Sequence, residues 1–143
     1  MSSNQISLTQ SGITVVPQGL NVLWGFKGTF TIPFSHIKQV SSTSYDDLYS
    51  GSDPLRRKAG LDFFDKQVGF FRKKKTSIYL NLKKNEQLLR LALVADFVDV
   101  VILGVDDADH WLSKINQALN ANTSDFSHQA DESLQVIESY PND

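Results

Sequence analysis

Short stretches of β-branched and aromatic residues, separated by turn residues, fill the first 45 positions. Glycine and proline recur between these stretches, which interrupts any helix and is typical of short strands joined by tight turns. The predicted strands cover residues 13–16, 20–24, 29–32 and 37–41. A stretch rich in serine and acidic residues follows at residues 42–60, and we expect it to form the longest internal loop.

The strand pattern resumes after residue 60. Apolar and polar positions alternate from Thr76 to Lys83, a period of two that predicts a strand with one buried face. Residues 87–95 have good helix propensity, but their leucines also alternate, and we predict a strand. Residues 98–105 form a nearly continuous apolar run, as in a strand covered on both faces.

One amphipathic helix is predicted near residues 107–121. Its apolar residues recur at spacings of three and four and form a single stripe: Ala108, Trp111, Leu112, Ile115, Ala118 and Leu119. Asp106 or Asp107 can cap its first turn, and Asn120 or Asn122 can end it.

The order of these elements predicts a mainly β domain with one C-terminal helix. We assign it to residues 1–122 and predict that residues 123–143 are an acidic, flexible tail, since large apolar residues are sparse there. The length of 143 residues and the 41% hydrophobic content are those of a single ordinary globular domain.

Composition excludes several kinds of chemistry. The absence of cysteine rules out disulfides, thiolate nucleophiles and cysteine zinc sites. The first residues lack the basic and apolar regions of a signal peptide, and the longest apolar run is far shorter than the ~20 residues of a membrane helix. We therefore expect a cytoplasmic protein.

Three segments resemble a known family. The segment Asp109–Ile115, with its tryptophan, resembles the C-terminal helix of the pleckstrin-homology-like superfamily, where a tryptophan packs into the barrel core. Residues 16–20 leading to residues 32–37, and residues 101–108, resemble bacterial relatives of that fold. The resemblance covers about residues 5–121 and implies a split barrel of about seven antiparallel strands capped by an amphipathic helix.

One part of the family pattern is missing. Lipid-binding members resemble one another in a basic motif between the first two strands, but residues 17–29 of this chain contain only Lys27 as a basic residue. The resemblance therefore does not extend to the inositol phosphate pocket.

Charge is strongly segregated along the chain, although the net charge is only -2. Residues 56–84 contain ten basic residues and two carboxylates, a net charge of +8. Residues 96–143 contain ten carboxylates and one lysine, a net charge of -9. Such a distribution suits binding between oppositely charged regions.

The candidate binding residues are a set of seven cations, which we name the basic cluster: Arg56, Arg57, Lys58, Arg72, Lys73, Lys74 and Lys75. Residues 72–75 fall where a hairpin turn is expected, so all four are predicted to project into solvent and attract anions. The alternative is that a charged turn only keeps a sheet edge soluble.

Other site chemistries are poorly supported. The three histidines are isolated in sequence, capping explains the aspartates near residue 107, and we predict no metal or cofactor. No nucleophile motif or phosphate loop is present, so the chain is predicted not to be an enzyme, with a site assembled from distant residues as the alternative. The pI near 5.9 argues against nucleic acid as the partner.

These observations favour a non-enzymatic interaction module. Its predicted partner is a protein, including a second copy of this chain bound head to tail. The alternative is peripheral binding to anionic lipid through the basic cluster, with the acidic tail as a restraint.

Overall fold

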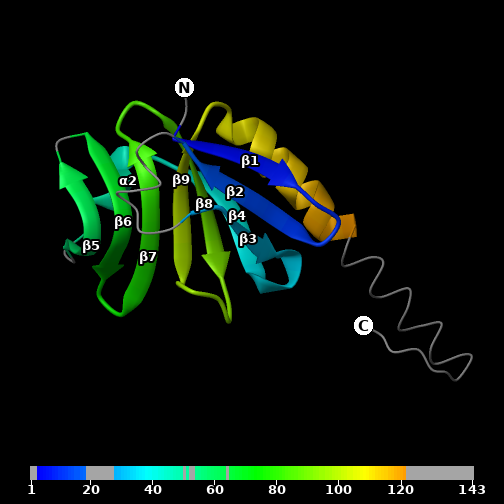
Figure 1. Ribbon diagram of the computed structural model, residues 1–143, viewed down its shortest axis with the longest axis horizontal. Coiled ribbons are helices and arrows are strands. Elements are labelled where there is room, and N and C mark those ends of the chain that lie inside the picture. The colour runs from blue at the N-terminus through cyan, green and yellow to red at the C-terminus, as the bar shows by residue number, and fades with distance from the viewer. Residues whose placement is uncertain (1–2, 19–27, 50, 52–53, 64, 122–143) are drawn as a thin grey trace, which may run out of the picture.

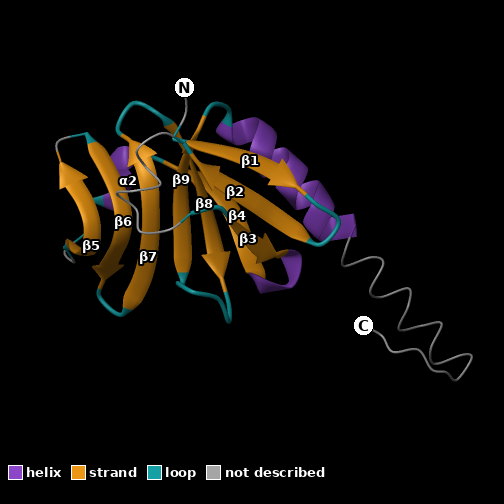
Figure 2. Cartoon of the chain, viewed as in Figure 1, coloured by secondary structure: helices purple, strands orange, loops and turns teal. Residues whose placement is uncertain are grey.

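The protein is mainly β, with a helix at the end of the described chain (Figures 1 and 2). The computed structural model describes residues 3–18, 28–49, 51, 54–63 and 65–121, apart from the side chains of Leu61 and Phe63. These residues form nine strands in two sheets. The predicted mainly β fold with a C-terminal helix is confirmed. Its two sheets do not close into one barrel and are consistent with a split-barrel sandwich.

The smaller sheet is an antiparallel meander near the N-terminus. Its strands are β1 (Asn4–Leu8), β2 (Gly12–Pro17) and β3 (Phe30–Pro33). Side chains at alternate positions of β2 and β3 are buried, as the period of two requires. The predicted strands at 13–16 and 29–32 are confirmed, and the one at 20–24 lies outside the described residues.

The larger sheet has the order β4-β8-β9-β7-β6-β5. Its strands are β4 (Ile37–Thr43), β5 (Leu55–Phe63), β6 (Lys66–Lys73), β7 (Thr76–Lys83), β8 (Gln87–Leu93) and β9 (Val100–Val105). All neighbours are antiparallel except β7 and β9, which are parallel. The resemblance implied about seven strands, all antiparallel; in the described chain, two more form and β9 inserts between β7 and β8.

The prediction of one long loop over residues 42–60 is wrong. A 3-10 turn (Phe34–His36) precedes β4, and after β4 a short helix, α2 (Tyr45–Leu48), begins at Ser44, whose side chain caps it. β5 then starts at Leu55. The basic triplet in this stretch is therefore in a strand, because pairing with β6 supplies the backbone hydrogen bonds that a loop would leave to water.

Both faces of the larger sheet carry buried side chains. One face packs against the smaller sheet and the C-terminal helix, with Tyr79, Leu91 and Val101 in its core. The other face carries a second apolar cluster, which includes Ile78, Ile102 and Leu48 of α2. β9 is buried at every position, which explains its continuous apolar sequence and confirms that prediction.

The C-terminal helix spans residues 108–121 and runs along β1, coloured yellow to orange in Figure 1. The side chain of Asp107 accepts a hydrogen bond from the backbone N–H of His110 at 3.1 Å, as a helix cap does. Ala108 and Ile115 are buried. Trp111, expected to be sunk into the core, is only partly buried and packs against the core at its edge.

Candidate functional site

The basic cluster lies on two paired strands and the turn beside them. Arg56, Arg57 and Lys58 are in β5, Arg72 and Lys73 end β6, and Lys74 and Lys75 form the two-residue turn to β7. Strand pairing sets Arg56 directly opposite Arg72 and Leu55 opposite Lys73. Residues that are 16 positions apart in the sequence are thus neighbours in the sheet.

These cations do not all project into solvent together. Six of them are exposed, but Lys73 is partly buried, and its Nζ donates a hydrogen bond to the backbone oxygen of Leu48 at 3.3 Å. The prediction that Lys73 projects into solvent with its neighbours is wrong, because successive residues of a strand point to opposite faces of the sheet. Lys73 lies on the same face as Phe71, which belongs to the second apolar cluster, and Arg72 lies on the opposite face of the sheet.

A cavity of about 340 Å³ opens on that face, next to the turn at Lys74. We name it the β7–β9 pocket, and it is lined by Thr43, Asp47, Leu48, Leu55, Lys73, Lys74, Thr76, Ile78, Arg90, Val100 and Ile102. Buried side chains of β7 and β9 form its apolar floor. Three cations and one carboxylate line it, so its net charge is positive.

Arg90 is the pocket residue that sequence reasoning missed. It is partly buried in β8, where Leu89 and Leu91 flank it and both are fully buried. Within the described chain its guanidinium makes no hydrogen bond or ion pair. None of its nitrogens is among the buried side-chain atoms that lack a hydrogen-bond partner, so its N–H donors can still be reached by an acceptor from outside the described chain.

A signal for Arg90 was present in the sequence. It is the one charged residue in an otherwise apolar strand, between Gln87 and Leu93. The alternation of the leucines explained that position as the polar face of a strand. The second apolar cluster shows that this face is also buried in part, so exposure to solvent does not fully explain a charged residue at this position.

Two other cavities are less suited to a charged ligand. A cavity of about 370 Å³ lies between β1 and the start of the helix, with Asp106 and Trp111 in its wall. A wider groove of about 950 Å³ runs between the 3-10 turn, β4 and the end of the helix, and Lys38 is its one charged wall residue. The β7–β9 pocket is smaller, but it combines an apolar floor with several charges.

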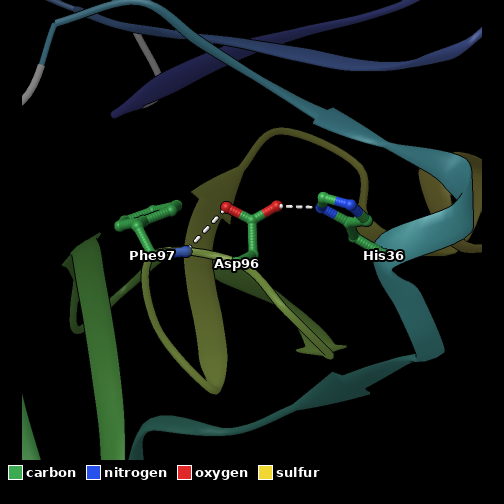
Figure 3. Close-up of polar contacts among 3 residues, drawn as sticks. All are labelled: His36, Asp96 and Phe97. Atoms are coloured by element: carbon green, nitrogen blue, oxygen red, sulfur yellow. Dashed lines mark hydrogen bonds and ion pairs between the residues drawn. The ribbon is translucent and has the colours of Figure 1, made fainter.

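His36 and Asp96, which do not line this pocket, form an ion-pair contact (Figure 3). The Nδ1 atom of His36 lies 2.8 Å from Oδ2 of Asp96, and the backbone N–H of Phe97 donates to the other carboxylate oxygen at 2.7 Å. The contact joins the 3-10 turn to the loop between β8 and β9. We interpret it as a structural contact, since both carboxylate oxygens of Asp96 already have hydrogen-bond partners.

Comparison with protein-family models, with curated proteins and with solved structures gave no match for this chain. In the described ranges, every helix is too short or too polar to cross a bilayer.

Proposed function

We propose that this protein is a non-enzymatic interaction module that binds an acidic segment of a protein partner at the basic cluster and the β7–β9 pocket. The observation that carries the proposal is Arg90, a partly buried residue at the edge of an apolar floor, whose guanidinium has no acceptor among the described residues. A carboxylate is its natural partner, because guanidinium and carboxylate form two parallel hydrogen bonds.

A second copy of the chain is the partner that charge favours. The basic strands β5, β6 and β7 lie toward one end of the long axis in Figure 1, and the C-terminal helix starts near the middle and runs toward the other end. The separation of basic and acidic segments along one chain favours head-to-tail contacts, which close into rings or extend as filaments. The sequence of residues 123–143 contains five carboxylates and no lysine or arginine.

Light scattering on the full chain tests this proposal. We expect a mass above that of the monomer at low salt, and a fall toward the monomer as salt shortens the Debye length from about 30 Å at 0.01 M to about 3 Å at 1 M. A double charge reversal, Arg56→Glu with Arg72→Glu, should give a monomer at all salt concentrations. A wild-type chain that stays monomeric at every concentration and salt would rule out self-association.

A second candidate is the surface of an anionic membrane. The observation in its favour is that Arg56, Lys58, Arg72, Lys74 and Lys75 are all exposed around one turn. Each basic residue near such a surface contributes about 1 kcal/mol of binding free energy. Sedimentation with phosphatidylserine vesicles at low salt tests it, and phosphatidylcholine vesicles are the control.

A further inference from the structure

We infer that the β7–β9 pocket recognises a segment in extended conformation with the pattern acid, apolar, apolar, acid at every second residue, and that residues 132–138 of a second copy supply it. This inference rests on the proposed function and names the segment that the site accepts. It follows from the positions of two cations on the sheet and of four side chains in the sequence.

The two cations, Arg90 and Lys73, lie at the two ends of a diagonal across the larger sheet. Arg90 in β8 is opposite Ile102 in β9, and Lys73 in β6 is opposite Thr76 in β7. Between them, Val100 in β9 is opposite Ile78 in β7. Arg90, Val100, Ile78 and Lys73 therefore follow one another on successive strands, all on the pocket side of the sheet.

The length of this diagonal follows from strand geometry. The two cations are three strand spacings apart across the sheet and about four residues apart along it. With about 4.8 Å between strands and about 3.3 Å per residue, a flat sheet separates their Cα atoms by roughly 20 Å. Two buried aliphatic side chains, Val100 and Ile78, occupy the space between.

The C-terminal sequence contains a matching pattern. Glu132, Leu134, Val136 and Glu138 are spaced by two, so an extended segment directs all four to one side. Six residues of extended chain place the two carboxylates about 20 Å apart, with two aliphatic side chains between them. The carboxylates would meet Arg90 and Lys73, and the aliphatic side chains would meet the apolar floor.

Asp47 and the turn lysine restrict what else binds. Asp47 lines the same pocket and repels an anion placed on the α2 side, whereas Lys74 adds to the attraction at the Lys73 end. A uniformly acidic segment would leave the floor uncovered, and a purely apolar one would leave Arg90 without an acceptor. The alternation of acid and aliphatic residues is thus the selective feature.

The test is fluorescence anisotropy of a labelled peptide with the sequence of residues 130–143, titrated with the full chain. We expect saturable binding that is weakened about tenfold or more by Arg90→Met, since methionine keeps the aliphatic stem and removes the guanidinium. Lys114→Met is the matched control, because it removes one exposed cation of the C-terminal helix, outside both the pocket and the basic cluster, and it should weaken binding by less than about threefold.

Peptide variants test the spacing. A peptide of the same composition in which acidic and aliphatic residues no longer alternate should bind about tenfold more weakly if the pattern is recognised. Equal binding of the two peptides, or equal losses for Arg90→Met and Lys114→Met, would overturn this inference. A thermal unfolding curve for Arg90→Met that matches the wild type shows that a loss is not caused by unfolding.

The self-association measurement separates the two proposals. If Arg90→Met still self-associates at low salt as the wild type does, the interaction function stands and the pocket assignment is wrong. If the wild type is monomeric and also fails to bind the peptide, both are wrong.

Discussion

Asn4 in β1 and Asn81 in β7 join the two sheets through reciprocal hydrogen bonds. Asn4 Nδ2 donates to the backbone oxygen of Asn81 at 2.8 Å, and Asn81 Nδ2 donates to Oδ1 of Asn4 at 2.9 Å. Asn4 also donates to the backbone oxygen of Gly104 at 3.1 Å, and both asparagines are buried. This pair holds the first strand against the centre of the larger sheet.

Asn4→Ala should therefore destabilise the protein severely. The change leaves buried polar groups of Asn81 and Gly104 without their partner, at a cost of about 3 kcal/mol in the free energy of unfolding. Urea unfolding followed by circular dichroism measures it. Thr14→Ala is the control, because the Thr14–Thr31 contact is exposed and its loss should change stability by less than about 0.5 kcal/mol.

Arg56→Glu should stabilise the protein at low salt. Like charges directly opposite in an antiparallel pair repel, and the substitution turns the contact with Arg72 into an attraction, a gain of about 0.2–1 kcal/mol. The gain should vanish at high salt because both side chains are exposed. Lys58→Glu makes the same charge change at a bulge, where no residue of β6 is directly opposite, and an equal gain there would contradict the pairwise explanation.

Tyr79 should make stability fall in alkaline solution. Burial raises the pKa of Tyr79 from 10.0 to about 12, and the neighbouring Asn81 side chain offsets part of that shift. Below pH 10 the hydroxyl is protonated in both the folded and unfolded states, so it does not change stability. Between pH 10 and 12 only the unfolded state loses the proton, which lowers stability by up to about 1.4 kcal/mol per pH unit.

The control for this prediction is a matched pair of variants. Tyr79→Phe should remove most of that alkaline loss. Burial also raises the pKa of Tyr49, but its side chain is 46% exposed, so solvent limits its effect and Tyr49→Phe should change the pH profile less. Urea unfolding across this pH range measures both. Identical profiles for the two variants would contradict the assignment to Tyr79.

Lys74→Gly should separate stability from binding. Lys74 has a φ of 59° and Ala95 a φ of 58°, in the left-handed region that glycine adopts without strain. Replacing either by glycine should raise the free energy of unfolding by up to about 1 kcal/mol. Only Lys74→Gly should weaken binding of the acidic peptide, because only Lys74 lines the β7–β9 pocket. Weaker binding by Ala95→Gly would show that backbone rigidity, not charge, controls it.

Local periodicity was sufficient to predict most elements. The alternation in residues 76–83, the apolar run that became β9 and the three- and four-residue spacing of the helix each predicted an element that forms. The reason is that a strand or helix repeats its exposure at a fixed period, whatever partner it packs against. Residues 42–60 escaped this reasoning, because β5 has charged residues on an edge strand and lacks a clear period.

The order of the strands in the larger sheet determines which residues form the candidate site. The hydrophobic periodicity of each strand contains no information about that order. Lys73 and Arg90 appear unrelated in the sequence, yet the insertion of β9 beside β7 places them on one face with two buried aliphatic side chains between them. Two further contacts also join residues that are distant in the sequence: the ion-pair contact of His36 with Asp96 and the hydrogen bonds of Asn4 with Asn81. The sequence by itself determined which residues repeat together along each element; the tertiary structure decided which elements meet, because strand pairing is a long-range choice made by the packing of the whole core.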